Sequence, residues 1–247
     1  MKSKRTNSSV IKGLLLALLC LGLVAGRAAG GQIAGTVTHL SGPLLAKKAD
    51  GSSKSMTLKS EVEEGDTLVT AKRTYAKIKF ADGSEVTLKP DTQFKVEHFS
   101  FNPDTPSEDS AVMNLVKGGL RSVTGKIGKR GNEDAYEMKT PTATIGIRGT
   151  VYGATFCQGN ECGRLPPGLY VDVSDGKIVV FNKAGTQLFT VGQFGFVPTP
   201  TVPPTILPSN PGASFVPPPA MNAPAPAEQK NGPAGTTPAK PIDCEVR

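Results

Sequence analysis

The alternation of apolar and polar residues around an Asp-Gly pair most constrains the fold. In residues 76–80 (AKIKF) the apolar side chains occupy every second position, and they resume at Val86 and Leu88 after Asp82 and Gly83. Period-two alternation places one set of side chains on one face of a strand. Asp-Gly between two such runs is typical of a β-hairpin. We therefore expect a half-buried hairpin here.

The pattern of short strand-like runs separated by turns extends over residues 32–197. Short runs rich in Val, Ile, Thr and Phe are separated by glycine turns, and no stretch has helical periodicity. About a dozen strands with turns every 8–12 residues predict an all-β domain: a sandwich, a roll or a solenoid-like fold. We expect one strand to end at Gly118 and Gly119, and a turn at Asp175 and Gly176. His98 continues the apolar alternation of Phe94 and Val96, so we expect it on their face, in the core or at an edge.

Residues 140–150 (TPTATIGIRGT) form the most unusual strand candidate. Pro141 fixes φ and pushes Thr140 into an extended conformation, which favours a strand entry. Gly146 and Gly149 interrupt a β-branched run where the backbone bends or is approached closely. Arg148 stands between Ile147 and Gly149, and Thr150 closes the motif. Two roles are open for Arg148: anchoring a strand crossing through its five donors, which we favour, or contacting a partner or anion.

The first 30 residues predict a secretory signal peptide. Residues 1–12 carry four cations and no acid, residues 13–24 are leucine-rich, and small residues follow. A retained anchor is the alternative, but 12 apolar residues fall short of the ~20 that a membrane-spanning helix needs. A lipoprotein interpretation of Cys20 is weaker because Leu19 precedes it. We expect an exported protein, periplasmic or extracellular, with no stable membrane span after cleavage.

Removal of the predicted signal peptide would lower the net charge of the protein. The formal net charge of +7 comes from 28 basic and 21 acidic residues, and five of the basic residues lie in the predicted signal peptide. The remainder is close to neutral, with 23 basic and 21 acidic residues. Nucleic-acid binding needs a concentrated basic face, so we expect no nucleic-acid partner.

Residues 198–247 hold 14 of the 21 prolines and few large apolar side chains. Such segments stay extended and cannot fill a core, so we expect a disordered or polyproline-II tail. A solvated tail is favoured over a partner-binding arm.

Three cysteines follow the predicted signal peptide: Cys157, Cys162 and Cys244. The first two bracket the polar turn QGNE, and in an oxidising compartment such a pair more often forms a local disulfide than a metal site. A zinc site wants four ligands, and the two histidines, His39 and His98, are far away in sequence. We expect a disulfide, no metal and no cofactor, with Cys244 left over.

The order of several short motifs resembles the FecR domain. They are GDTLVT (65–70), FADGSEVTLKPDT (80–92), VKGGLRSVTG (116–125), TPTATIGIRGT (140–150), VSDGKIVVFN (173–182) and VGQ (191–193). The resemblance covers about residues 32–197 and implies an exported, all-β domain of the kind found in regulators that relay receptor occupancy to a sigma factor. Only residues 1–12 precede the apolar run, so we expect a stand-alone exported FecR-domain protein without a cytoplasmic anti-sigma segment.

Three classes of function are compatible with these sequence features. The favoured one is a non-enzymatic envelope module that binds a protein, glycan or cell-wall partner. The alternative is a periplasmic component of FecR-type cell-surface signalling, iron- or siderophore-responsive through a sigma factor, that acts via a membrane partner. An enzyme is the least favoured class because general acid–base chemistry needs a convergent pair of groups. The candidate acids Asp66, Asp82 and Asp175 all sit beside turn glycines and are expected to hydrogen-bond their own turns.

Overall fold

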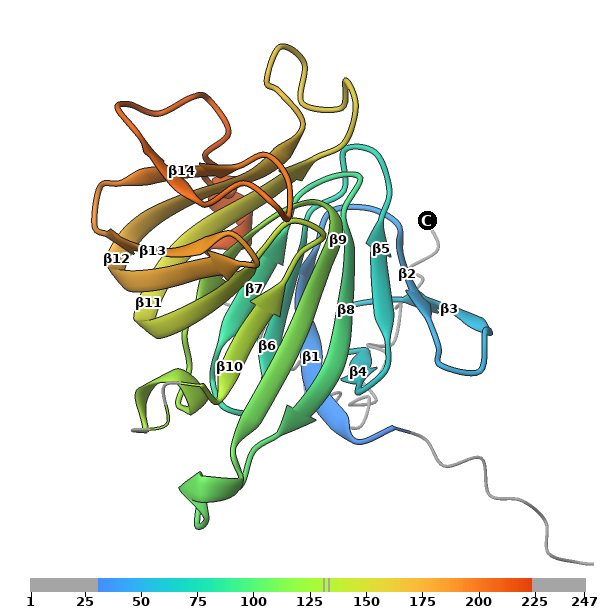
Figure 1. Cartoon of the computed structure of the whole chain (residues 1–247). Coiled ribbons are helices and arrows are strands. Elements are labelled where there is room, and N and C mark those ends of the chain that lie inside the picture. Colours follow the sequence, from blue (N-terminus) through green and yellow to red (C-terminus); the bar gives the residue numbers. More distant parts are fainter. Residues whose placement is uncertain (1–30, 131, 133, 224–247) are drawn as a thin grey trace, which may run out of the picture. The chain divides into compact units, whose positions relative to one another are not determined.

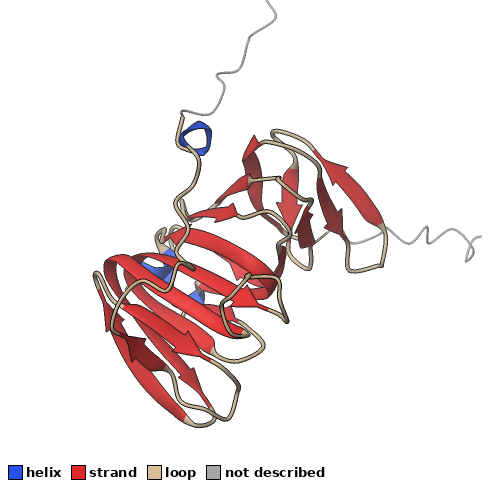
Figure 2. Cartoon of the chain, turned by 90° about the horizontal axis from the view of Figure 1, so that it is seen from above, coloured by secondary structure: helices blue, strands red, loops and turns tan. Residues whose placement is uncertain are grey.

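The computed structural model describes residues 31–130, 132 and 134–223. Its regular elements are strands and three short 3₁₀ turns, and Figure 2 shows strand almost throughout. The all-β prediction is confirmed. The predicted signal peptide, Cys20, Cys244 and residues 224–247 lie outside the described residues. Within the described part, no helix is long and apolar enough to cross a membrane.

The strands run in the order β1 (Ile33–Leu40), β2 (Leu44–Lys47), β3 (Ser53–Met56), β4 (Glu61–Glu63), β5 (Thr67–Thr70), β6 (Ala76–Phe80), β7 (Glu85–Leu88), β8 (Gln93–Ser100), β9 (Ser110–Val123), β10 (Tyr136–Lys139), β11 (Thr144–Cys157), β12 (Gly168–Asn182), β13 (Gly185–Thr190), β14 (Phe194–Val197) and β15 (Thr205–Leu207). The 3₁₀ turns are η2 (Pro106–Glu108), η3 (Ile127–Lys129) and η4 (Pro219–Met221). All strands belong to one hydrogen-bonded sheet, and β9 and β10 pair in parallel.

The sheet divides into two sets of strands that share β9, β11 and β12, the long strands in Figure 1. The first layer is β4, β1, β6, β7, the second halves of β9 and β11, the first half of β12, β14 and β15. The second layer is β3, β2, β5, β8, the first half of β9, β10, the first half of β11, the second half of β12, and β13. Each long strand therefore changes partners midway.

A glycine with positive φ marks each of these changes. φ is +81° at Gly118 in β9, +64° at Gly149 in β11 and +72° at Gly176 in β12. These values lie in the left-handed region that L side chains avoid. The expected strand end at Gly118 and turn at Asp175 and Gly176 are therefore wrong. Both strands continue past the glycine, because each one pairs with β11 beyond the bend.

The core lies between the two layers. Phe80 of β6 and Phe99 of β8 pack with ring centroids 5.5 Å apart, and both are almost fully buried. The hydroxyls of Tyr136 and Tyr152 lie 3.2 Å apart, which joins β10 of the second layer to the second half of β11 in the first. Burial raises the pKa of both phenols. The hairpin of β6 and β7 pairs as expected, with Ile78 opposite Val86 and both side chains buried.

The expectation that His98 shares the face of Phe94 and Val96 is wrong. The ladder between β8 and β9 shifts register between Val96 and His98, so the alternation slips by one residue. Phe99 takes the buried position, and His98 is exposed with its Nδ1 3.1 Å from Glu64 Oε2.

The expected disordered tail is wrong for residues 198–223. β15 pairs with β14, and residues 211–223, the C-terminal strap, follow. Several contacts join the strap to the rest of the domain. Thr155 Oγ1 donates to Ala213 O (3.2 Å), the rings of Tyr75 and Phe215 stack at 5.8 Å, and His39 Nε2 lies 2.8 Å from Ala223 O. A few small and apolar side chains at buried positions are enough to hold a proline-rich chain that supplies few backbone donors.

Candidate functional site

The motif strand begins with a closed turn rather than a strand entry. Thr140 Oγ1 donates to Ala143 O (2.7 Å) and accepts from Ala143 N (3.1 Å), and Thr140 N also donates to Ala143 O (2.9 Å). Pro141 lies inside this turn, and β11 starts only at Thr144. Thr140 and Pro141 therefore set where the strand begins, and they act through local backbone geometry.

Thr150 lies at the bend of β11 and is buried. Its Oγ1 donates to Lys177 O (2.6 Å) and accepts from Arg148 N (3.3 Å). Thr124, just past β9, makes a reciprocal pair with it: Thr124 Oγ1 donates to Thr150 O (2.7 Å) and accepts from Thr150 N (3.0 Å). These hydroxyls replace the ladder hydrogen bonds that the bend interrupts. Thr124 was not singled out from sequence, since only the fold brings it beside Thr150.

Gly149 and Gly146, the two glycines of the motif, have different structural roles. A Cβ at Gly176 would collide with the carbonyl oxygen of Gly149, so the two bends touch where β11 and β12 change layers. Gly146 has no positive φ, and a Cβ there would meet only Val179 O at 3.8 Å, an ordinary contact. The fold of the described chain therefore does not require glycine at position 146.

Gly146 faces outward on the second layer. Its cross-strand neighbour Val179 lies opposite Leu188 of β13, which is 45% exposed, and Phe181, two residues along β12, is 39% exposed. Side chains two residues apart on a strand share a face, so these groups lie together. We call Gly146, Arg148, Lys177, Phe181 and Leu188 the motif face.

The motif face carries two neighbouring cations, and Glu137 of β10 lies opposite Gly146 on the same face of the sheet. Arg148 and Lys177 are directly opposite each other on β11 and β12. Like charges in that position disfavour the sheet unless other groups offset them. Lys177 is exposed and Arg148 is partly buried. The motif face therefore joins exposed apolar side chains to two neighbouring cations.

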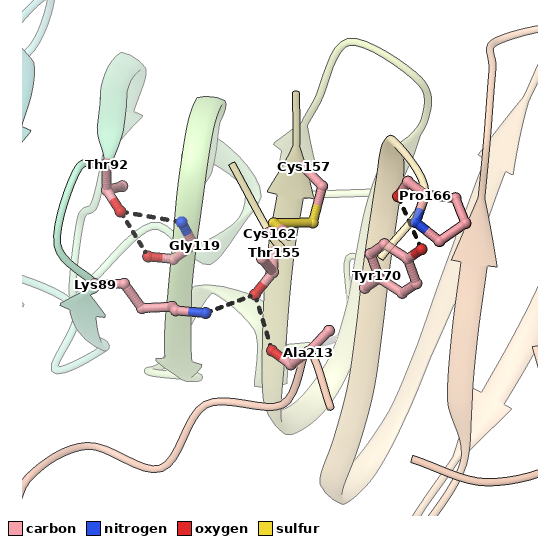
Figure 3. Close-up of a disulfide and its surroundings, with 9 residues drawn as sticks. All are labelled: Lys89, Thr92, Gly119, Thr155, Cys157, Cys162, Pro166, Tyr170 and Ala213. Carbon is pink, nitrogen blue, oxygen red and sulfur yellow. Dashed lines mark hydrogen bonds between the residues drawn. A yellow bond between two sulfur atoms is a disulfide. The ribbon is translucent and has the colours of Figure 1, made fainter. Parts of the chain in front are cut away.

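The predicted disulfide is confirmed between Cys157 and Cys162, with a Cα–Cα distance of 5.6 Å. It closes the loop at the end of β11, and Figure 3 shows it near Thr155 on the same strand. The adjacent segment is held by Tyr170, whose hydroxyl donates to Pro166 O (2.9 Å).

Comparison with known proteins gives a family match. Residues 66–179 match the family model described as FecR protein. The chain carries a FecR domain. The match includes β11 and most of the motif face. The comparison of this chain with curated proteins finds no match.

Two crystal structures of a candidate anti-sigma factor from Parabacteroides distasonis resemble this chain with TM-scores of 0.46 and 14% identity. The aligned part covers 58% of this chain and 60% of that protein. A cell surface anchoring domain aligns with a TM-score of 0.25 and 25% identity, over 26% of this chain and 83% of that one. Likeness at these levels transfers no function.

Two of the three candidate acids, Asp66 and Asp82, have structural partners. Asp82 Oδ1 accepts from Ser84 N (2.9 Å), and Asp66 Oδ2 accepts from Glu63 N (2.9 Å), as expected of turn aspartates. Asp66 is also paired with Lys48 Nζ at 3.0 Å. Asp175 lies within β12 rather than in a turn. In the described part of the chain, no group of three or more His, Cys, Asp or Glu residues is placed to hold a metal ion.

Proposed function

We propose that this FecR domain is a non-enzymatic interaction module of the cell envelope that binds a protein partner through the motif face. The single observation that carries the proposal is Gly146. Position 146 lies in the strand that carries the sequence motif, and the packing of the domain leaves room for a Cβ there. A missing side chain in the middle of an exposed apolar and cationic surface supports close approach by another backbone.

The chemistry of the motif face fits one kind of partner. Phe181 and Leu188 offer exposed apolar area, and the exposed Lys177 lies directly opposite Arg148. Aromatic residues and arginine are enriched at protein interfaces, and charge complementarity steers association. The matching surface is an envelope protein segment with apolar side chains and acidic residues.

The test compares partner capture by matched surface variants. The exported full-length protein is crosslinked in cells as wild type, as Phe181→Ser with Leu188→Ser, and as Val202→Ser with Ile206→Ser. The control pair is also exposed but lies at β15 and the loop before it. Loss of two apolar anchors should reduce recovery of the specific partner by about tenfold or more, whereas the control should not.

A protein captured equally by all three forms, or no protein enriched by the wild type, contradicts the proposal. Unchanged melting temperatures for both variants show that the surface rather than the fold was altered.

The family match also supports a second function, a role in FecR-type cell-surface signalling through a membrane partner and a sigma factor. Deleting the gene should then change iron-responsive transcription, measured by RNA sequencing with and without an iron chelator. The Phe181→Ser, Leu188→Ser form should reproduce the deletion. Transcription that is indifferent to the deletion overturns the signalling role and leaves the interaction module standing.

A further inference from the structure

A cleft of about 350 Å³ lies where the first layer meets the disulfide loop. The β7–β8 corner, the bend of β9, the end of β11 and the loop closed by Cys157 and Cys162 form its walls, and Lys72 lies at its side. We call it the corner pocket. Its volume is near the lower end of the range for small-molecule sites, which suits a small ligand.

Lys89 is the central charge of the corner pocket. Its stem runs over Gly119, where a Cβ would lie 2.7 Å from Lys89 Cδ, so the glycine makes room for it. Its Nζ donates to Thr155 Oγ1 at 3.4 Å, a long hydrogen bond visible in Figure 3, and lies 5.7 Å from the centre of the Phe215 ring. The lysine is thereby directed across the strands.

The ammonium group of Lys89 has more hydrogen-bond donors than the described residues accept from it. It has three N–H donors, and within the described residues it makes one hydrogen bond and no ion pair. Thr155 Oγ1, its one partner, already donates to Ala213 O. Burial lowers the pKa of Lys89, and the more distant charge of Asp172 opposes this shift. An anion that accepted the remaining donors would offset the cost of burying this charge.

The charged residues that line the corner pocket indicate how many negative charges a bound anion would carry. Lys72, Lys89 and Lys117 face Asp91 and Glu161, an excess of one positive charge. Lys117 Nζ is paired with Glu161 Oε1 at 2.6 Å. Lys89 and Lys72 then remain against Asp91 and the more distant Asp172, whose charge Arg121 also offsets. One excess positive charge suits a monoanion, and a second negative charge would meet Asp91 without compensation.

We propose that the corner pocket binds the carboxylate of a small organic acid or of a peptide C-terminus, with Lys89 Nζ as its principal donor. The bound carboxylate accepts the donors that Lys89 leaves unused, and Lys72 adds a second positive charge. The disulfide holds the wall that carries Glu161. The corner pocket and the motif face are built by different layers, so this inference does not depend on the proposed protein partner.

The test titrates the ¹⁵N-labelled full-length protein with three probes and follows the amide signals of Gly118, Gly119 and Glu161. The probes are propionate, N-acetyl-alanyl-alanine, and the same dipeptide with a C-terminal amide. Both carboxylates should shift these signals, and the amide should bind about tenfold or more weakly because it lacks the charge. Tighter binding of the dipeptide acid than of propionate identifies a peptide terminus as the source, and the reverse order identifies a small acid.

Variants assign the effect to Lys89. Lys89→Met keeps the length of the stem without the charge and should weaken carboxylate binding about tenfold or more. Lys89→Arg keeps the charge and should retain binding, and it serves as the folded comparison if Lys89→Met unfolds. Lys183→Met, exposed between β12 and β13, should bind like the wild type. Equal binding of acid and amide, no shift with any probe, or full binding by Lys89→Met overturns the proposal.

Discussion

At the scale of single residues, glycine serves opposite purposes in neighbouring positions of one strand. Gly149 takes a backbone conformation that other residues avoid, and its carbonyl lies where a side chain at Gly176 would be. Gly146, three residues earlier, is free of both constraints. The first kind of glycine is explained by folding, whereas the packing of the described residues does not require the second.

Gly176→Ala should be strongly destabilising, and Gly51→Ala separates the two causes. Both positions have positive φ, at +72° and +85°, but a Cβ at Gly51 has nothing within 4 Å. Gly51→Ala should therefore cost only the backbone term, about 1–2 kcal/mol. Gly176→Ala should cost more because its Cβ also collides with Gly149 O. Urea unfolding measures both, and equal losses would contradict the collision.

At the scale of elements, the long strands rather than the hairpins define the architecture. β9, β11 and β12 each pair with different strands before and after the bend. Thr150 and Thr124 supply side-chain hydrogen bonds where the ladder is interrupted. Because the bends are shared, a change at one of them affects both layers.

The disulfide should contribute modestly to the stability of this assembly. Cys157 and Cys162 are five residues apart, and a loop this short gives up about 2 kcal/mol of unfolded-chain entropy on closure. Cys157→Ala with Cys162→Ala should lower the free energy of unfolding by up to about that amount, measured by denaturation under oxidising conditions. Adding a reductant should destabilise the wild type and leave the double variant unchanged. If the reductant destabilised both forms equally, its effect would not come from the Cys157–Cys162 disulfide, and the prediction would be wrong.

At the scale of the whole molecule, the C-terminal strap partly buries ionisable groups of the first layer. Burial raises the pKa of Asp172 above the ordinary 3.8 and lowers that of Lys89 below 10.5, and each charge opposes the other's shift. Both groups are therefore less easily charged in the folded protein than in the unfolded chain.

The sign of the resulting pH dependence follows from the Asp172 shift. Its folded pKa is raised, so the folded state binds the proton more tightly than the unfolded chain does. The stabilisation is complete below the unfolded pKa and is lost as pH rises through the folded pKa. The free energy of unfolding of the wild type, minus that of Asp172→Asn, should therefore fall as pH rises from the ordinary aspartate pKa of 3.8 towards neutral pH.

Urea unfolding at several pH values in this window checks the difference. Taking the difference cancels the contributions of other carboxylates, such as Glu97, whose pKa is lowered by its hydrogen bonds to Asn114 and Lys139 against the opposing effect of burial. Asp175→Asn, exposed on β12, controls for the change of acid to amide. A wild-type minus Asp172→Asn difference that stayed constant or grew with pH would refute the expectation.

Much of the site could be predicted locally, and part of it could not. The closeness of Cys157 and Cys162 in sequence was enough to predict their disulfide, and the turn chemistry of Asp66 and Asp82 was visible in the residues beside them. The roles of Lys89 and Leu188 could not be predicted from the residues beside them in sequence. The unsatisfied donors of Lys89 and the exposure of Leu188 depend on which segments of the folded chain pack around them.

Period-two alternation and β-branched runs are written in the chain, so the sequence by itself determined an all-β domain with the β6–β7 hairpin and the FecR motif order. The tertiary structure alone decided whether a glycine turns the chain back or bends it onward. Gly83 and Gly176 both follow an aspartate and both have positive φ, yet the first closes a hairpin and the second carries β12 from one layer to the other. The local backbone preference is the same at both positions, and the difference lies in the partner strands, which only the folded chain provides.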